Sequence, residues 1–190
     1  MRKLSVFLCT LAFSGMAWAQ TTYKHPLPIQ VAGCQDSVAT LFWDTSTDGP
    51  VPECYSSSGV LKGRARFPDA STATMYTTFV LPLDFDASAT EVRIWWSTSA
   101  TSGNVVWQLG LSCVNDAESD TQSYTTTTVT GAAAGTTNYM KKVSKSSWNV
   151  TGCTGELAHL KVWRDPTNGS DTIAADAYIS GIELRQTITY

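Results

Sequence analysis

Apolar and polar side chains alternate with a period of two along several stretches of this chain, and this pattern restricts its fold more than any other feature. Between Asn104 and Val114, one face of an extended segment would carry Val105, Trp107, Leu109, Leu111 and Cys113. The same alternation runs through Glu91–Ser97 and Glu156–Arg164. Because successive side chains of a strand point to opposite faces, each segment predicts a half-buried β-strand. No window has a sustained helical period, so the chain is predicted to be all-β.

Four further segments are rich in β-branched or aromatic residues and are also predicted as strands: Thr74–Leu81, Gln122–Thr130, Thr137–Val143 and Ala174–Thr189. In the last of them the alternation changes phase at Ser180-Gly181, which predicts a β-bulge. Together the segments predict an antiparallel, jelly-roll-like β-sandwich of about eight strands. We expect it to span residues 61–190, after an N-terminal arm with a disulfide loop at 20–60.

The first nineteen residues have the features of an export signal. Arg2 and Lys3 supply a positive start, an apolar run follows, and Ala17-Trp18-Ala19 fits the small-x-small pattern that a signal peptidase recognises. We expect cleavage after residue 19 to remove the only candidate membrane segment. The sequence therefore predicts a secreted or cell-surface protein, with a periplasmic location also open.

Four cysteines remain after this segment, namely Cys34, Cys54, Cys113 and Cys153. An even number of cysteines in an exported chain indicates disulfides, and four cysteines allow three pairings. We favour Cys34–Cys54, which would close the arm, and Cys113–Cys153, which would join a strand to a distant turn. The close C-x-x-C spacing typical of zinc sites is absent.

The charge balance excludes one class of partner and disfavours another. The formal net charge is −3, and no cluster of basic residues stands out along the sequence. Proteins that bind nucleic acids usually carry such a basic patch, so no nucleic-acid partner is expected. A mildly acidic protein is also a poor match for anionic membranes.

Few residues are available for catalysis. His25 and His159 are the two histidines, and the G-x-S-x-G motif of many serine hydrolases is absent. A pair of carboxylates among Asp84, Asp86 and Asp176 could hydrolyse a glycoside if two of them faced each other across a groove. We predict a protein that is not an enzyme.

A second group of aspartates follows the strand that ends at Arg164. Asp165, Asp171 and Asp176 could together hold calcium, which prefers several oxygen ligands. The alternative is turn chemistry, in which each aspartate bonds to its own backbone. No other cofactor is expected.

The tryptophans are the most suggestive residues for binding. Trp95 and Trp96 are adjacent in a predicted strand, so they point to opposite faces, and Trp96 belongs with the core residues. Trp163 lies opposite the face of Leu160 and Val162. If exposed, Trp95 and Trp163 could stack on sugar rings or anchor a protein interface. The alternative is that both rings are buried.

The stretch from Phe67 to Leu184 resembles a β-sandwich domain of tailed-phage virion proteins. The resemblance rests on Phe79-Val80-Leu81-Pro82 with Asp84-Phe85-Asp86, on Ile94-Trp95-Trp96, on Thr101 to Trp107, on Leu160 to Asp165, and on Gly181-Ile182-Glu183-Leu184. It implies jelly-roll strands and a structural or adhesive role. It carries no catalytic signature.

Three functions follow from these observations. The leading expectation is an exported, non-enzymatic structural subunit that associates with itself or with other surface proteins through strand edges and its N-terminal arm. The first alternative is a carbohydrate-binding module that uses Trp95 and Trp163. A weaker alternative is a glycan-degrading enzyme.

Overall fold

A computed structural model describes residues 22–35, 38–41, 44–45, 49–57, 60–82, 85, 87–117, 123–150, 153 and 157–189. The predicted signal peptide lies outside these ranges. No helix among them is long and apolar enough to cross a membrane. Within them the chain forms strands and one 3-10 turn, η1 (Ala87–Ala89).

The strands follow one another along the chain as β1 (Thr22–Ile29), β2 (Ala32–Gln35), β3 (Val38–Leu41), β4 (Asp44–Thr45), β5 (Val51–Ser57), β6 (Val60–Phe67), β7 (Thr74–Val80), β8 (Thr90–Thr98), β9 (Asn104–Val114), β10 (Thr125–Ala132), β11 (Lys141–Trp148), β12 (Leu157–Arg164) and β13 (Ala177–Thr189). A six-stranded sheet has the order β11-β8-β13-β6-β5, with β1 also paired to β13. A five-stranded sheet has the order β10-β9-β12-β7-β4, and β2 and β3 form a separate pair.

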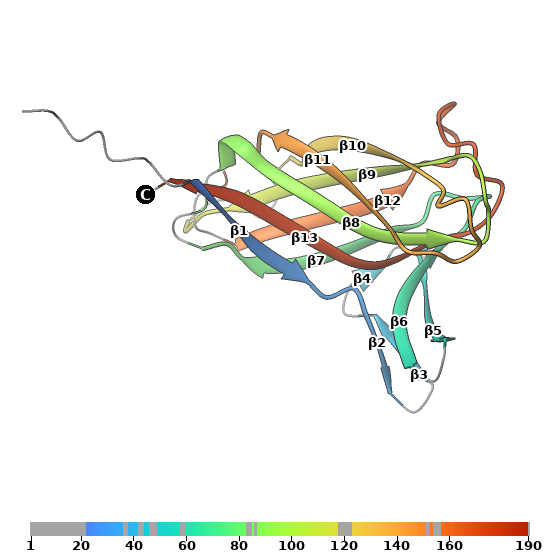
Figure 1. Ribbon diagram of the computed structural model, residues 1–190. Coiled ribbons are helices and arrows are strands. Elements are labelled where there is room, and N and C mark those ends of the chain that lie inside the picture. Colours follow the sequence, from blue (N-terminus) through green and yellow to red (C-terminus); the bar gives the residue numbers. More distant parts are fainter. Residues whose placement is uncertain are drawn as a thin grey trace, which may run out of the picture.

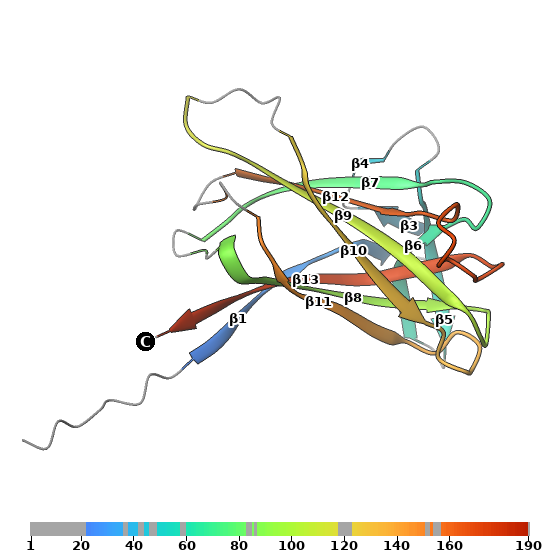
Figure 2. The ribbon, with the colours of Figure 1, turned by 90° about the horizontal axis from the view of Figure 1, so that it is seen from above.

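All these pairings are antiparallel, and the two large sheets form the two layers of a sandwich (Figures 1 and 2). The predicted all-β sandwich is therefore confirmed. The structure has more strands than expected because the N-terminal region is also extended.

The core lies between the two sheets, where the apolar residues of each alternating strand meet. Trp96 of β8 and Trp107 of β9 are buried, and their rings meet edge to face with centroids 6.2 Å apart. Phe67 of β6 packs on Trp107 in the same way at 5.2 Å. Such edge-to-face contacts are favourable beyond the area that the rings bury. The opposite residues of the same strands face outward, and they form the two surfaces available for binding.

Several strand predictions match closely. The segment Asn104–Val114 is β9 with the same bounds, and the predicted bulge lies in β13, where the register with β8 shifts between Ile179 and Gly181. One prediction is wrong: Thr137–Met140 is a turn, and the strand β11 begins only at Lys141. Asn138 explains this difference, because its φ of 60° interrupts the extended backbone.

The N-terminal region differs from the irregular arm that the sequence suggested. Strand β1 pairs with β13 along its whole length, from Thr22↔Thr189 to Ile29↔Ile182. Pro26 and Pro28 lie two residues apart in β1, so their nitrogens face the same edge. Because proline lacks an N–H, this edge must be the one that faces away from β13. The free edge of β1 is therefore poor in donors for a further strand.

The second predicted disulfide, Cys113–Cys153, is present and joins the end of β9 to the segment before β12. Cys54 is also disulfide-bonded. Its proposed partner Cys34 belongs to the residues whose side chains the structure does not describe, so that pairing stays a prediction.

Candidate functional site

Trp95 and Trp163, the two predicted sugar platforms, lie on opposite outer faces of the sandwich. Trp95 is on β8 of the six-stranded sheet, and Trp163 is on β12 of the five-stranded sheet. Both side chains are half-buried. The structure therefore does not bring them into one site, and each face must be considered by itself.

On the five-stranded sheet, Trp163 already has a cation against its ring. The ammonium of Lys161 lies 4.6 Å from the Trp163 ring centroid and 5.8 Å from the Tyr76 ring centroid. These distances allow cation–π attraction to both rings. A sugar would have to displace the Lys161 side chain to stack on them, which makes this face the weaker candidate.

On the six-stranded sheet, the Trp95 ring lies across the neighbouring strand. Gly181 of β13 is its register partner, and a Cβ built on Gly181 would be 3.9 Å from Cε3 of the ring. Trp95 and Gly181 line a hollow of ≈ 390 Å³ together with Pro28, Ile29, Gln30, Ile182 and Glu183. Because Gly181 has no side chain, the indole ring can lie over the backbone of β13, and space remains beside the ring.

A change of strand partner along β13 explains why hollows form here. On one edge of β13, residues Ala177–Ile179 pair with β6, and residues from Ile182 onward pair with β1. Ser180 and Gly181 lie between the two sets of pairs and have neither strand as a partner. Strand β6 diverges from β13 at this point (Figure 1). The outer face is therefore opened where the partner of β13 changes.

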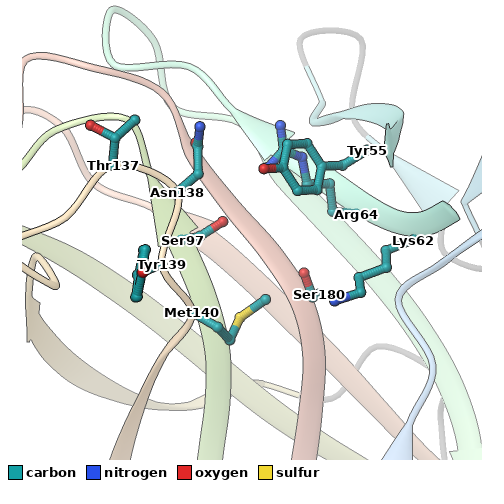
Figure 3. A pocket seen from close by; sticks show the side chains of 9 residues that line it. All are labelled: Tyr55, Lys62, Arg64, Ser97, Thr137, Asn138, Tyr139, Met140 and Ser180. Carbon is teal, nitrogen blue, oxygen red and sulfur yellow. The ribbon is translucent and has the colours of Figure 1, made fainter. Parts of the chain in front are cut away.

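A second hollow of ≈ 250 Å³ adjoins the same point, and Figure 3 shows its lining. Tyr139 and Met140 stand on one side, Tyr55, Lys62 and Arg64 on the other, and Ser97 and Ser180 lie between them. Ser97 is two residues from Trp95 on β8, and Ser180 precedes Gly181 on β13. The two hollows are thus neighbours on one face, and we call them together the outer groove.

The turn before β11 carries the exposed side of the groove. The backbone N–H of Asn138 donates to the Thr98 carbonyl over 2.8 Å, and the Thr137 hydroxyl donates to the Ser99 carbonyl over 3.2 Å. Asn138 adopts the left-handed conformation that asparagine tolerates better than most residues. These contacts fix the turn to the end of β8 and leave Tyr139 64% exposed at the rim.

Arg64 is the most constrained residue of the groove. Its guanidinium carbon lies 4.2 Å from the Tyr55 ring centroid and 3.7 Å from the Tyr178 ring centroid, so it is held between two rings. Its Nε donates to Glu53 Oε2 over 2.9 Å. Burial, followed by the nearby Glu53 carboxylate, raises the pKa of the Tyr178 hydroxyl.

Beyond Trp95, the same face carries a network of ion pairs centred on Glu91. Glu91 accepts hydrogen bonds from Lys24 and from Arg93, each over 2.7 Å, and Arg185 lies 3.6 Å away. Burial by itself would raise the pKa of the Glu91 carboxyl, but the bonds from Lys24 and Arg93 outweigh it and hold that pKa below its usual range. This network ties β1 to β8 next to the groove.

The three aspartates proposed for calcium have separate partners. Asp171 binds the Arg164 guanidinium, with Nη2 to Oδ1 at 2.8 Å, while Asp176 lies 3.7 Å from Arg66 and Asp165 accepts a bond from Thr167. Across the part of the chain that the structure describes, no three or more His, Cys, Asp or Glu side chains gather as a possible metal site. Asp84 and Asp86 lie outside the described residues. The calcium site stays a prediction.

Trp95 was predicted as a site residue from the sequence, whereas Tyr55, Arg64 and Tyr139 were not. Trp95 was found because its neighbour Trp96 has to face the core. The other three come from β5, β6 and the turn before β11, which are far apart in the sequence. One local signal was available for Tyr139, because an Asn-Tyr pair between two strands fits an exposed turn.

No known protein family matches the sequence, and no curated protein matches it. Among solved structures, it is similar to the second family 16 carbohydrate-binding module (16% identity; 75% of this chain and 89% of that one; TM-score 0.45). It is also similar to Xyl-CBM35 in complex with a glucuronic acid-containing disaccharide, with 12% identity over 87% of this chain and 95% of that one and a TM-score of 0.43. A third similar structure is the mannan-recognising module TmCBM27, with 7% identity over 89% of this chain and 99% of that one and a TM-score of 0.41.

These findings correct the leading expectation of a self-associating structural subunit, which is wrong. The similar structures named above are described as carbohydrate-binding modules, not as assembling subunits. In addition, the predicted arm is paired within its own chain as β1, and its prolines weaken the free edge for strand addition.

Proposed function

We propose that this chain is an exported carbohydrate-binding module whose glycan lies in the outer groove of the six-stranded sheet. One observation carries the proposal: the aromatic residues Trp95 and Tyr139 line neighbouring hollows on the same sheet face, and the polar residues Ser97 and Ser180 line the hollow of Tyr139. Sugars have apolar C–H faces that stack on such rings, and hydroxyl groups that need nearby donors and acceptors.

The shape of the groove suits a chain better than a single small molecule. The two hollows have volumes of ≈ 250 and ≈ 390 Å³ and are lined by the adjacent residues Ser180 and Gly181, so a ligand that occupies both would extend along β13 from Tyr139 past Trp95. Asn138, Ser97 and Gln30 supply amide and hydroxyl groups along this path. We infer an oligosaccharide segment of a longer polymer as the ligand.

The proposed module binds its glycan without cleaving it. Glycoside hydrolysis uses two carboxyl groups on either side of the scissile bond. Among the described residues that line the groove, Glu183 is the single carboxylate, and it lies within 3.9 Å of both Arg93 and Arg185. The disulfide Cys113–Cys153 supports an oxidising, extracellular location together with the predicted signal peptide.

Calorimetric titration against a panel of neutral and acidic oligosaccharides tests the proposal. Trp95→Ala and Tyr139→Ala should each weaken binding about tenfold or more, because stacked aromatic residues dominate such contacts. Trp163→Ala and Tyr124→Ala are matched controls, since both rings lie on the five-stranded sheet's outer face, where Tyr124 covers Gly110. These two variants should bind within about twofold of the parent.

Two results would contradict the proposal. Binding that is lost in Trp163→Ala but kept in Trp95→Ala would move the ligand to the other face. If no glycan of the panel binds the folded protein, carbohydrate binding itself is wrong.

A further inference from the structure

The guanidinium of Arg64 is held in a fixed plane beside the groove. The Tyr55 and Tyr178 rings fix its plane from both sides, and Glu53 occupies its Nε. Its Nη1 and Nη2 atoms make no hydrogen bond to any residue that the structure describes, and the residue lines the groove. A planar, preorganised pair of N–H donors matches the two oxygens of a carboxylate or a sulfate ester.

A second cation lies beside it, and it forms no ion pair with a carboxylate of the described residues. Lys62 is two residues from Arg64 on β6, lines the same hollow, and is exposed. The lining of this hollow among described residues includes Lys62 and Arg64 but neither aspartate nor glutamate. Arg64 already has Glu53 as an ion-pair partner, but Lys62 has no carboxylate among the described lining residues, so an anionic sugar can supply a counter-charge that an uncharged sugar cannot.

The whole outer face of the six-stranded sheet is more basic than the chain, whose formal net charge is −3. On that face the strand registers gather the basic residues Lys24, Lys62, Arg64, Arg66, Arg93, Lys142 and Arg185 against the acidic residues Glu53, Glu91, Asp176 and Glu183. The sequence alone hides this patch because its members come from β1, β5, β6, β8, β11 and β13. A face with an excess of basic residues attracts anionic ligands.

We propose that the outer groove selects an anionic sugar, whose uronic carboxylate or sulfate ester is bound by Arg64 and Lys62. This inference rests on the proposed carbohydrate binding and names the ligand class of that same groove. The aromatic residues Tyr139 and Trp95 stack on the sugar rings, and the two cations discriminate between charged and uncharged polymers of similar shape.

Pairs of ligands that differ in charge alone give the sharpest test. Oligogalacturonate is compared with its methyl ester, and a sulfated oligosaccharide with its desulfated form, by calorimetric titration at about 50 and 500 mM NaCl. We expect the charged member of at least one pair to bind about tenfold tighter at the lower salt concentration, and this advantage to shrink at the higher one.

Two variants assign the effect to the groove. Lys62→Gln changes an exposed residue and should weaken binding of the charged ligand about fivefold. Arg64→Lys keeps the charge but loses the fork of donors, and should weaken it about tenfold or more. Lys145→Gln on β11 makes the same charge change outside the groove lining and should have no effect beyond about twofold.

The outcomes separate this inference from the proposed function. If only uncharged glycans bind, or if Lys62→Gln and Lys145→Gln behave alike, anion selectivity is overturned while carbohydrate binding stands. If a DNA oligonucleotide binds as tightly as the anionic glycans, charge alone explains the binding and the inference is overturned. If no glycan binds, both proposals fail.

Discussion

The guanidinium of Arg164 and the carboxylate of Asp171 form an ion pair inside the protein, and 0% and 2% of the two side chains is exposed. Nε donates to Oδ2 over 3.0 Å and Nη2 donates to Oδ1 over 2.8 Å. Arg164 also donates to the carbonyls of Ile173 and Ala175, and Asp171 accepts from the Val106 N–H. The pair therefore fastens the loop after β12 to the end of β12 and to β9.

Removing one partner of this pair should be costly. Asp171→Ala leaves a buried guanidinium without its counter-charge, so we expect the free energy of unfolding to fall by about 3–5 kcal/mol. Urea denaturation measures this change. Asp116→Ala is the matched control, because it removes the same charge from an exposed residue and should change stability by no more than about 0.5 kcal/mol. Equal stabilities of the two variants would contradict a stabilising role of the pair.

The fold could be predicted where each residue's environment is set by its own strand. Asn104–Val114 alternates without interruption, and its bounds were predicted without error. The environment of Arg164 could not be predicted in the same way. Alternation with Leu160 and Val162 places Arg164 on the inner face. A buried arginine requires a partner, and here that partner is Asp171, which lies in a loop seven residues further along the chain. Such tertiary partners leave no periodic signal.

Glycine is required at position 103, between β8 and β9. Gly103 has a φ of +93°, and a Cβ there would lie 2.9 Å from the Thr172 carbonyl oxygen. We expect Gly103→Ala to destabilise the protein by about 1–3 kcal/mol through backbone strain, with the clash adding to it. Gly135→Ala separates the two causes, because Gly135 has a φ of +79° but open space around it. The thermal unfolding temperature of Gly103→Ala should be lower than that of Gly135→Ala. The reverse order would contradict the role of the clash.

The disulfide between Cys113 and Cys153 joins residues separated by 40 positions. Closing a loop of this length in the unfolded chain stabilises the native state by about 4 kcal/mol in the chain-entropy account. We expect the double variant Cys113→Ala/Cys153→Ala to lose a similar amount in urea denaturation under oxidising conditions. Under reducing conditions the parent protein and the variant should have similar free energies of unfolding. If the parent stays more stable after reduction, the bond contributes little to stability.

The groove was harder to predict than the core for a physical reason. Whether a residue belongs to the core follows from the face of its own strand on which it lies, whereas the groove depends on which strands become neighbours. Arg64 and Tyr139 come from β6 and from the turn before β11, and they face each other only because β6 leaves β13 at the bulge. The bulge itself was predicted from Ser180-Gly181, but the change of partner strand at that point was not.

The ion-pair network of Glu91 should make stability depend on acidity. The pKa of Glu91 is lowered in the folded protein relative to its value of 4.5 in a free peptide, because Lys24 and Arg93 stabilise the carboxylate despite its burial. The unfolded chain therefore takes up a proton at higher pH than the folded protein. The contribution of Glu91 is thus complete above about pH 4.5 and is lost as the pH falls through the folded pKa.

Glu91→Gln measures this contribution directly. Between pH 7 and about pH 5 the parent should be more stable than the variant by a constant amount, and the difference should shrink as the solution is acidified further. Lys24→Met should weaken the same dependence, because it removes one of the two hydrogen bonds that lower the pKa, whereas Lys145→Met, outside the network, should leave it unchanged. Urea denaturation at each pH gives the free energies. A difference between parent and Glu91→Gln that stays constant down to pH 2 would show that the carboxylate is no better stabilised in the folded protein than in the unfolded chain.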